Sequence, residues 1–144
     1  MRLEHLCDME LGYHGGFTLI QPYSGEEGIG FGMGGGRISG DQLAGQIRWA
    51  NAPRRRSDGV MLFQAYGVIT TEEHVPILFI LQGRLLGGQF SLTWQEQHLL
   101  TVWFEAEDER YRWLNTTLCL AEGRQDIETL RFTFHVYTCQ SNHF

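Results

Sequence analysis

Residues 130–137 read Leu-Arg-Phe-Thr-Phe-His-Val-Tyr, and this stretch decides the fold. Leu130, Phe132, Phe134 and Val136 fall on one side when every second residue is taken, and Arg131, Thr133, His135 and Tyr137 fall on the other. A repeat of two is the period of a β-strand, whose side chains point alternately to opposite faces. The stretch therefore predicts a strand with one buried face and one mixed face.

The same alternation recurs upstream. Leu100, Val102 and Phe104 oppose Thr101, Trp103 and Glu105, and in residues 113–120 the leucines at 114, 118 and 120 oppose Trp113, Asn115, Thr117 and Cys119. Glycine is abundant, at 18 of 144 residues, whereas there are three prolines, a composition that favours tight hairpins and curved strands. We predict an all-β fold, a single antiparallel β-barrel of eight to ten strands that forms one domain over residues 1–144.

Residues 41–50 are compatible with two structures. Asp41 could cap a helix that places Leu43, Ala44 and Ile47 on one side, whereas a strand would align Leu43, Gly45, Ile47 and Trp49. We favour the strand, because a glycine in the middle of a helix costs about 1 kcal/mol and the neighbouring segments are β in pattern.

Residues 76–81 are apolar on both faces, since Ile77, Leu78, Phe79 and Ile80 follow one another. A strand of this kind is covered on both sides. The barrel core would cover one side, and we expect a second copy of the chain, in a homodimer, to cover the other.

Composition excludes several chemistries. All 11 basic residues are arginine, so the chain has no lysine for a Schiff base, for pyridoxal phosphate or for a phosphate-binding P-loop. The formal net charge of −6 makes nucleic acid an improbable partner. No apolar run approaches the roughly 18 residues of a membrane span, and residues 1–5 lack the features of a signal peptide. We therefore expect a cytoplasmic protein with no membrane partner.

Neither the cysteines nor the histidines have metal-ligand spacing. Cys7, Cys119 and Cys139 are far apart, and the six histidines form no H-x-H, H-x-x-x-H or H-E-x-x-H pattern, although ligands can converge from distant strands. We accordingly expect no metal and no cofactor.

The glycine-rich segment 28–36 formally contains a G-x-G-x-x-G motif. A dinucleotide site also requires a preceding buried strand and a following helix, which the flanking residues do not favour. The alternation of Gly28, Gly30, Gly32 and Gly34 instead indicates a strand face left bare, against which a backbone, an aromatic ring or a ligand can pack.

Two short patterns place an aromatic ring beside a polar group. They are Trp103-x-Glu105 and Trp113-x-Asn115. If these strands are hairpin neighbours that face a cavity, the four side chains form one wall of a pocket, and burial raises the pKa of Glu105 toward that of a useful acid or base. In the alternative, Trp113 belongs to the core, Asn115 binds backbone, and Glu105 is one more solvated acid beside the acidic residues 107–109.

A series of residues occurs in a recognisable order and spacing over most of the chain: Gly36, Gly40, Leu43, Gly45, Trp49, Asp58-Gly59, Tyr66, Thr70, Glu72, Gly83, Phe104-Glu105, Tyr111, Trp113-Leu114-Asn115 and Gly123. This pattern resembles the domain of unknown function 3237 family, whose members resemble calycin-like and allene-oxide-cyclase-like barrels. This chain departs from the family pattern at Arg48, where an aspartate is usual, and at Ala65, where an arginine is usual. If both positions face a cavity, the exchange favours an anionic or carbonyl-bearing ligand.

A calycin-like barrel implies an internal pocket for a small hydrophobic or aromatic ligand. With that resemblance, we expect a cofactor-free acid/base enzyme, a lyase, isomerase or cyclase acting on a small aromatic or polyketide-like substrate. Trp49, Tyr66, Trp103 and Trp113 would hold the ring system, and Asn115 and Arg48 would polarise a carbonyl, while Asp58 or Glu105 would move the proton. The alternative is a non-catalytic carrier or sensor that uses the same pocket.

Overall fold

The computed structural model describes residues 1–21, 27–86, 96–126 and 128–143. Within them, nine strands form one antiparallel sheet, with a short 3-10 helix before β8. The elements are β1 (Arg2–Ile20), β2 (Gly28–Ser39), β3 (Gly45–Asn51), β4 (Arg54–Arg55), β5 (Met61–Thr70), β6 (Pro76–Leu86), β7 (Glu96–Glu105), η1 (Arg112–Thr116), β8 (Cys119–Gln125) and β9 (Phe132–Gln140).

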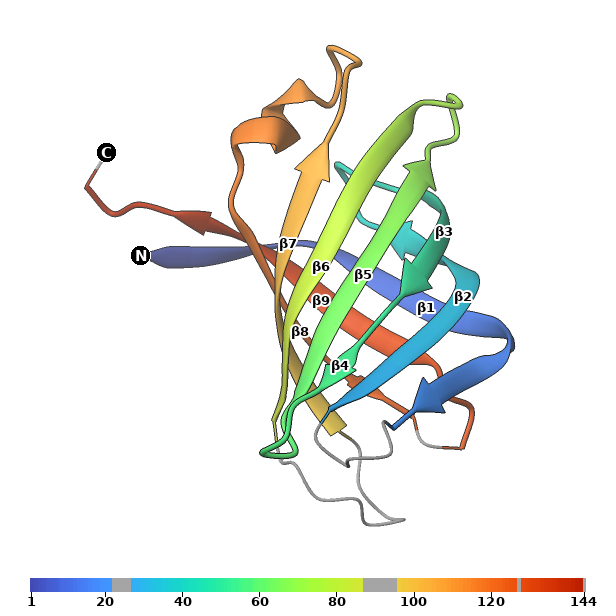
Figure 1. Ribbon diagram of the computed structural model, residues 1–144. Coiled ribbons are helices and arrows are strands. Elements are labelled where there is room, and N and C mark those ends of the chain that lie inside the picture. The colour runs from blue at the N-terminus through green and yellow to red at the C-terminus, as the bar shows by residue number, and fades with distance from the viewer. Residues whose placement is uncertain (22–26, 87–95, 127, 144) are drawn as a thin grey trace.

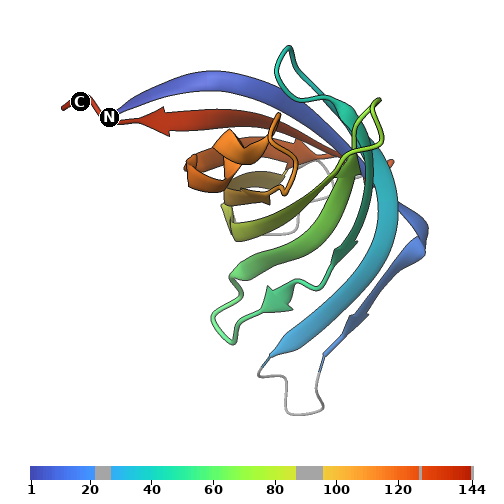
Figure 2. The same cartoon turned by 90° about the horizontal axis from the view of Figure 1, so that it is seen from above.

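The sheet closes on itself because β1 pairs with β9 on one side and with β2 on the other. Figures 1 and 2 show the strands curving round a common axis, with the two chain ends extending together from the barrel. The predicted all-β antiparallel barrel is thus confirmed. Among the described residues, no helix has the length and apolarity needed to cross a bilayer.

The long strand β1 pairs with both β2 and β9, and each of these two pairings is interrupted once. The register shifts between His5 and Cys7 on the β9 side, and between Tyr13 and Phe17 on the β2 side. Gly15 and Gly16 lie in the second interruption with φ of 82° and 91°, a conformation that residues with a β-carbon adopt at a cost. Bulges of this kind bend a strand and increase its twist, which allows β1 to wrap around the barrel.

The barrel interior is filled by alternate residues of every long strand. Phe132, Phe134 and Val136 of β9 are buried, as the alternation predicts, whereas Leu130 precedes the strand with φ of 58° and is 43% exposed. The strand expected over residues 41–50 begins at Gly45, and the predicted inward set of Leu43, Ile47 and Trp49 is buried.

The bare glycine face of β2 is confirmed. A β-carbon at Gly32 would lie 2.5 Å from the Tyr13 ring, and one at Gly30 would lie 2.4 Å from the Phe17 ring. The two aromatic rings of β1 therefore fold across β2 in space that only glycine leaves open.

The strand expected over residues 113–120 is wrong in its first half. Residues 112–116 form η1, and β8 begins only at Cys119. The Asn115 side chain explains the difference, because its Oδ1 accepts from the Ala106 N–H at 2.7 Å and its Nδ2 donates to the Ala106 carbonyl at 2.9 Å. This local closure replaces strand pairing where β7 ends.

Candidate functional site

An apolar pocket of about 290 Å³ is lined by residues from the start of β5 and the end of β6. Figure 1 shows that this end of the barrel is opposite η1. Its walls are mostly aromatic and aliphatic side chains from β1, β5 and β9. The polar groups among the described lining residues are Tyr13, Asn51, His98 and Gln125. A concave apolar pocket with a few convergent polar groups is the usual form of a small-molecule site.

Tyr13 and Asn51 form the polar pair of this pocket. Asn51 Nδ2 donates to the Tyr13 hydroxyl oxygen at 2.9 Å, and Asn51 is 1% exposed. Asn51 Oδ1 is buried and accepts no hydrogen bond from any described residue. Burial raises the pKa of Tyr13 to about 12, with the hydrogen bond from Asn51 opposing the shift. The phenol therefore stays protonated at neutral pH and keeps a proton to donate.

Trp49 holds Tyr13 in place. The two rings stack with centroids 5.1 Å apart, and the indole Nε1–H donates to the Gly12 carbonyl at 3.0 Å. Phe132 meets both rings edge to face, at 5.7 Å from Tyr13 and 5.6 Å from Trp49. Tyr13 and Phe132 form the floor of the pocket, and both pack against the buried Trp49.

His98 brings an imidazole to the same pocket. It points inward from β7, is 4% exposed, and meets Phe63 and Phe132 edge to face at 5.4 Å and 5.6 Å. A neutral imidazole has one N–H donor and one nitrogen acceptor, so it can pass a proton to or take one from a bound ligand.

None of Tyr13, Asn51 and His98 was singled out from the sequence. The signal was available for two of them, because His98 extends the inward series of Leu100 and Val102, and Asn51 extends that of Trp49. Tyr13 follows the two-residue register of Met9 and Leu11, but no sequence pattern ties it to Asn51.

Four of the predicted site residues lie on one outer face of the barrel, spread across the strands from β3 to β7. Arg48, Tyr66, Trp103 and Glu105 project from the outer face of β3, β5 and β7, and Tyr66 and Trp103 are 57% and 56% exposed. The Glu105 side chain is exposed to solvent, as in the alternative interpretation of the sequence.

Trp49 and Asp58 lie apart from that group. Trp49 is buried and supports the pocket through its stack on Tyr13. Asp58 lies in the turn before β5, where its carboxylate accepts from the Arg56 guanidinium and the Val60 N–H. These hydrogen bonds lower the pKa of Asp58 to about 2, that from Arg56 most. The aspartate is therefore ionised and already paired.

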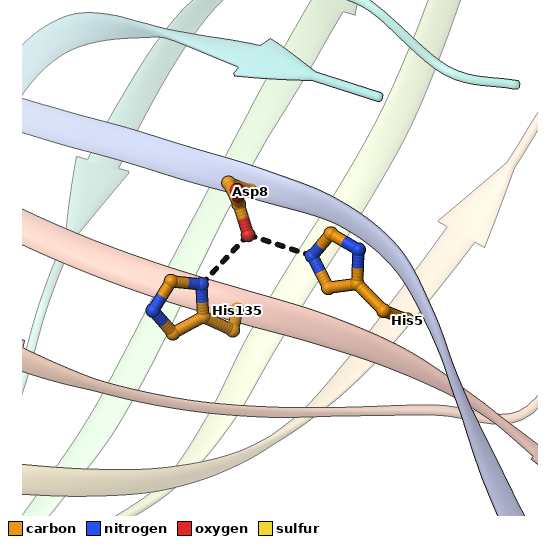
Figure 3. A group of neighbouring side chains, drawn as sticks. All are labelled: His5, Asp8 and His135. Carbon is orange, nitrogen blue, oxygen red and sulfur yellow. Dashed lines mark hydrogen bonds and ion pairs between the residues drawn. The ribbon is translucent and has the colours of Figure 1, made fainter. Parts of the chain in front are cut away.

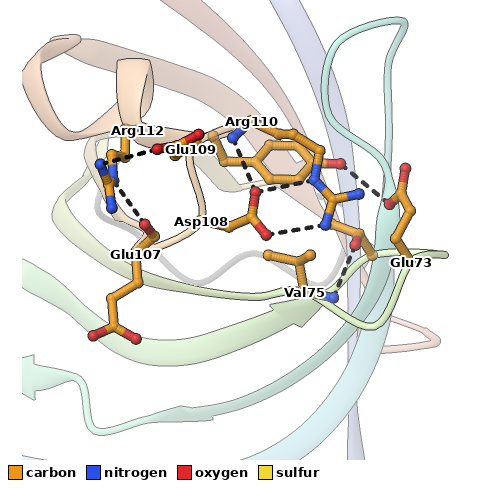
Figure 4. Close-up of polar contacts among 9 residues, drawn as sticks. Glu73, Val75, Glu107, Asp108, Glu109, Arg110 and Arg112 are labelled. Carbon is orange, nitrogen blue, oxygen red and sulfur yellow. Dashed lines mark hydrogen bonds and ion pairs between the residues drawn. The ribbon is translucent and has the colours of Figure 1, made fainter.

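Trp113 and Asn115 lie on η1, at the end of the barrel away from the pocket. Hydrogen bonds between its own residues stabilise the turn before η1 (Figure 4). Arg110 binds Asp108, and the Arg112 Nε–H donates to the Glu107 carbonyl at 2.7 Å. The Tyr111 hydroxyl donates to Glu73 at 3.3 Å. Asn115 binds the backbone of Ala106, as in the second interpretation of the sequence, and does not line the pocket.

One described cluster has the side chains of a metal site. His5 Nε2 and His135 Nδ1 each lie 2.7 Å from the same oxygen of Asp8, on the outer surface where β1 pairs with β9 (Figure 3).

No protein-family model matches the chain, and no curated protein matches it significantly. Solved structures are similar in fold. A β-barrel-like protein from Acinetobacter baumannii is 18% identical with a TM-score of 0.84 over 96% of each chain. A protein of unknown function from Clostridium acetobutylicum is 13% identical, with a TM-score of 0.82 over 97% of this chain and 100% of its own.

A third similar structure is described as an enzyme from Penicillium herquei. It is 19% identical with a TM-score of 0.68, over 94% of this chain and 93% of its own. At such identities the likeness establishes the barrel and not a shared activity. The resemblance to the domain of unknown function 3237 family stays a prediction.

Proposed function

We propose that the protein binds a small planar molecule in the open end of the barrel, with a carbonyl or hydroxyl oxygen directed at Tyr13. The observation that carries this proposal is the polar pair of Tyr13 and Asn51 in an otherwise largely apolar pocket of about 290 Å³. Isolated polar groups in such a pocket fix the orientation of a ligand whose apolar surface supplies most of the affinity.

The geometry supports an oxygen-bearing ligand for a specific reason. The Tyr13 oxygen already accepts from Asn51, so its own proton is available to a ligand acceptor. Asn51 Oδ1 is a buried acceptor that no described residue satisfies, and leaving such an atom unpaired costs about 1–3 kcal/mol. A ligand hydroxyl that reaches it would recover part of that cost.

The experiment compares 2-naphthol with 2-methylnaphthalene, which has a similar shape but no hydroxyl, by calorimetric titration of the full chain. We expect 2-naphthol to bind several-fold more tightly, since one hydrogen bond is worth about 1 kcal/mol. Tyr13→Phe should reduce that preference, because Asn51 remains as a partner for the ligand hydroxyl, while both compounds still bind. Tyr66→Phe, which removes a hydroxyl from the outer surface, should leave it unchanged.

Equal affinity of the wild-type chain for the two compounds would refute the role of the polar pair. Failure of both to bind would refute the pocket.

Acid/base catalysis is the second candidate, favoured by the His98 imidazole in the same pocket. In this form, Tyr13 polarises a carbonyl and His98 moves a proton, so the protein is a cofactor-free lyase, isomerase or cyclase. The carrier alternative needs only the binding. His98→Gln separates the two, because turnover of a substrate found by screening aromatic ketones should fall about 100-fold or more while 2-naphthol affinity changes little.

A further inference from the structure

We propose that His5, Asp8 and His135 bind a divalent transition-metal ion, with Zn²⁺ as the best fit to the donors. Two imidazole nitrogens and one carboxylate oxygen converge within 4.8 Å of one another. Mixed nitrogen and oxygen donors of this kind suit zinc and its neighbours, whereas Mg²⁺ and Ca²⁺ prefer sites made of oxygen.

A β-bulge builds this arrangement. In a regular strand His5 and Asp8 would face opposite sides, because they are three residues apart. The pairing of β1 with β9 runs from His5↔Tyr137 to Cys7↔Val136, so Leu6 is an extra residue that restores His5 to the face of Asp8. His135 is the direct cross-strand partner of Asp8. Bulges that re-aim a side chain are common beside functional sites.

The three side chains can adjust to an ion. His5, Asp8 and His135 are 51%, 41% and 50% exposed. Tetrahedral zinc with bonds of about 2.0 Å separates its ligand atoms by roughly 3.3 Å, so each 2.7 Å contact has to lengthen by about 0.6 Å. Exposure also leaves room for water to complete the coordination.

Two further carboxylates lie near the cluster. Glu122 of β8 is the cross-strand partner of His135, and Glu10 lies two residues beyond Asp8 on the same strand. Glu10 is paired with Arg37, and the Glu122 carboxylate accepts from the Tyr137 hydroxyl at 3.4 Å. Glu122 therefore adds a carboxylate beside the cluster, whereas Arg37 offsets the charge of Glu10.

The test is calorimetric titration of the chelator-treated full chain with zinc chloride. We expect one ion per chain. His5→Gln and His135→Gln should each weaken binding about tenfold or more, with circular dichroism confirming that both variants fold. His14→Gln, which removes an exposed histidine outside the cluster, should bind as the wild type does. No binding by the wild-type chain, or equal binding by all four proteins, would overturn the proposal.

A second inference rests on a different surface. The β3–β7 face is the set of outward side chains Arg48, Ala50, Tyr66, Val68, Leu78, Ile80, Trp103 and Glu105. Strand register arranges them in two adjacent rows, Arg48–Val68–Leu78–Glu105 and Ala50–Tyr66–Ile80–Trp103. Leu78 is 59% exposed, like its large neighbours Tyr66 and Trp103. A contiguous apolar area of this kind on a surface typically marks an interface.

Polar rows bound the β3–β7 face on both sides. Gln46 and Thr70 lie beyond the first row, and Gln82 and Thr101 lie beyond the second. An apolar centre with a polar rim is the usual anatomy of a protein interface.

We infer that a second copy of this chain covers the β3–β7 face about a twofold axis parallel to the strands, between β5 and β6. Such an axis places β3 of one copy opposite β7 of the other. Arg48 then faces Glu105 of the second copy, and the small Ala50 faces the large Trp103. The face is therefore complementary to itself in charge and in side-chain size, as an isologous interface requires.

Exchanging the charges of Arg48 and Glu105 tests the position of the proposed twofold axis. Sedimentation velocity should show the wild-type chain as a dimer at micromolar concentration. Arg48→Glu and Glu105→Arg should each weaken dimerisation about tenfold or more, because each opposes like charges twice in the dimer. The double variant should restore it. Glu128→Arg, in the turn before β9, should have no effect.

Leu78→Asp provides a separate test, since a charge at the centre of the face should yield a monomer that keeps its circular dichroism spectrum. A monomeric wild-type chain at about 100 µM would overturn the inference. Failure of the double variant to restore the dimer would overturn the proposed axis.

Discussion

The Asn115 side chain connects the end of β7 to η1 through two hydrogen bonds. Its amide both accepts from and donates to the backbone of Ala106, which is itself mostly buried. Two hydrogen bonds from one side chain to one residue mimic the pairing that a strand partner would supply. Asn115 is therefore a structural residue, and the adjoining Trp113 takes its position from the turn.

Asn115→Ala should lower the free energy of unfolding by about 1–3 kcal/mol, because it leaves the Ala106 N–H and carbonyl without those partners. Urea denaturation monitored by tryptophan fluorescence measures the change. Asn142→Ala, in the exposed C-terminal segment, is the matched control and should leave the midpoint in place. A variant as stable as the wild type would mean that water satisfies Ala106 equally well.

At the scale of the element, the glycines of β2 and the aromatics of β1 form one unit. Tyr13 pairs with Gly34 in the register of the two strands, and its ring lies over Gly32. Because Tyr13 also stacks on Trp49 and accepts from Asn51, the absence of a side chain at Gly32 determines where the floor of the pocket lies.

Gly32→Ala should destabilise the barrel by about 1–3 kcal/mol, since the new methyl group would overlap the Tyr13 ring in a packed site. Displacement of that ring should also reduce the affinity for 2-naphthol. Thermal unfolding and calorimetric titration report the two effects. Met33→Ala alters the neighbouring residue on the outward face and should change neither by a comparable amount. If the Gly32→Ala chain is destabilised but binds 2-naphthol as the wild type does, the glycine face of β2 does not determine the shape of the pocket.

At the scale of the whole molecule, closure of the sheet turns one face of every long strand into a single interior. Cys7 of β1 and Cys119 of β8 are fully buried there although 112 residues separate them in the sequence. Burial raises the pKa of Cys119 to about 11 and that of Cys7 further still. Both thiols therefore stay protonated well above neutral pH.

A thiol reagent such as Ellman's should label the half-buried Cys139 first at pH 8. Cys7 and Cys119 should react only in denaturant, since the thiolate is the reactive form and reagent reaches them only when the barrel opens. Raising the pH to 9 should not release them, because that value is below both pKa values. Mass spectrometry of the labelled peptides identifies the sites. Rapid labelling of Cys7 in native conditions would contradict a closed barrel.

The sequence by itself determined the class of fold and much of the inward face. Alternation is a local property, so Phe132, Phe134 and Val136 could be assigned to the core from neighbouring residues alone. The same held for Leu43, Ile47 and Trp49, and for the bare face of β2. The alternating pattern gave the wrong structure for residues 112–116. The Asn115 hydrogen bonds to Ala106 compete there with strand pairing, and the alternation of apolar and polar residues does not report them.

Only the tertiary structure decided which face belongs to which site. Closure and register place Arg48, Tyr66, Trp103 and Glu105 together on the outside, while Tyr13, Asn51 and His98 meet inside. His5, Asp8 and His135 converge because a bulge adds one residue to β1 and because the two ends of the chain pair. These contacts join residues as many as 130 positions apart. The period of two assigns a side chain to one of two faces, and pairing between distant strands decides its neighbours.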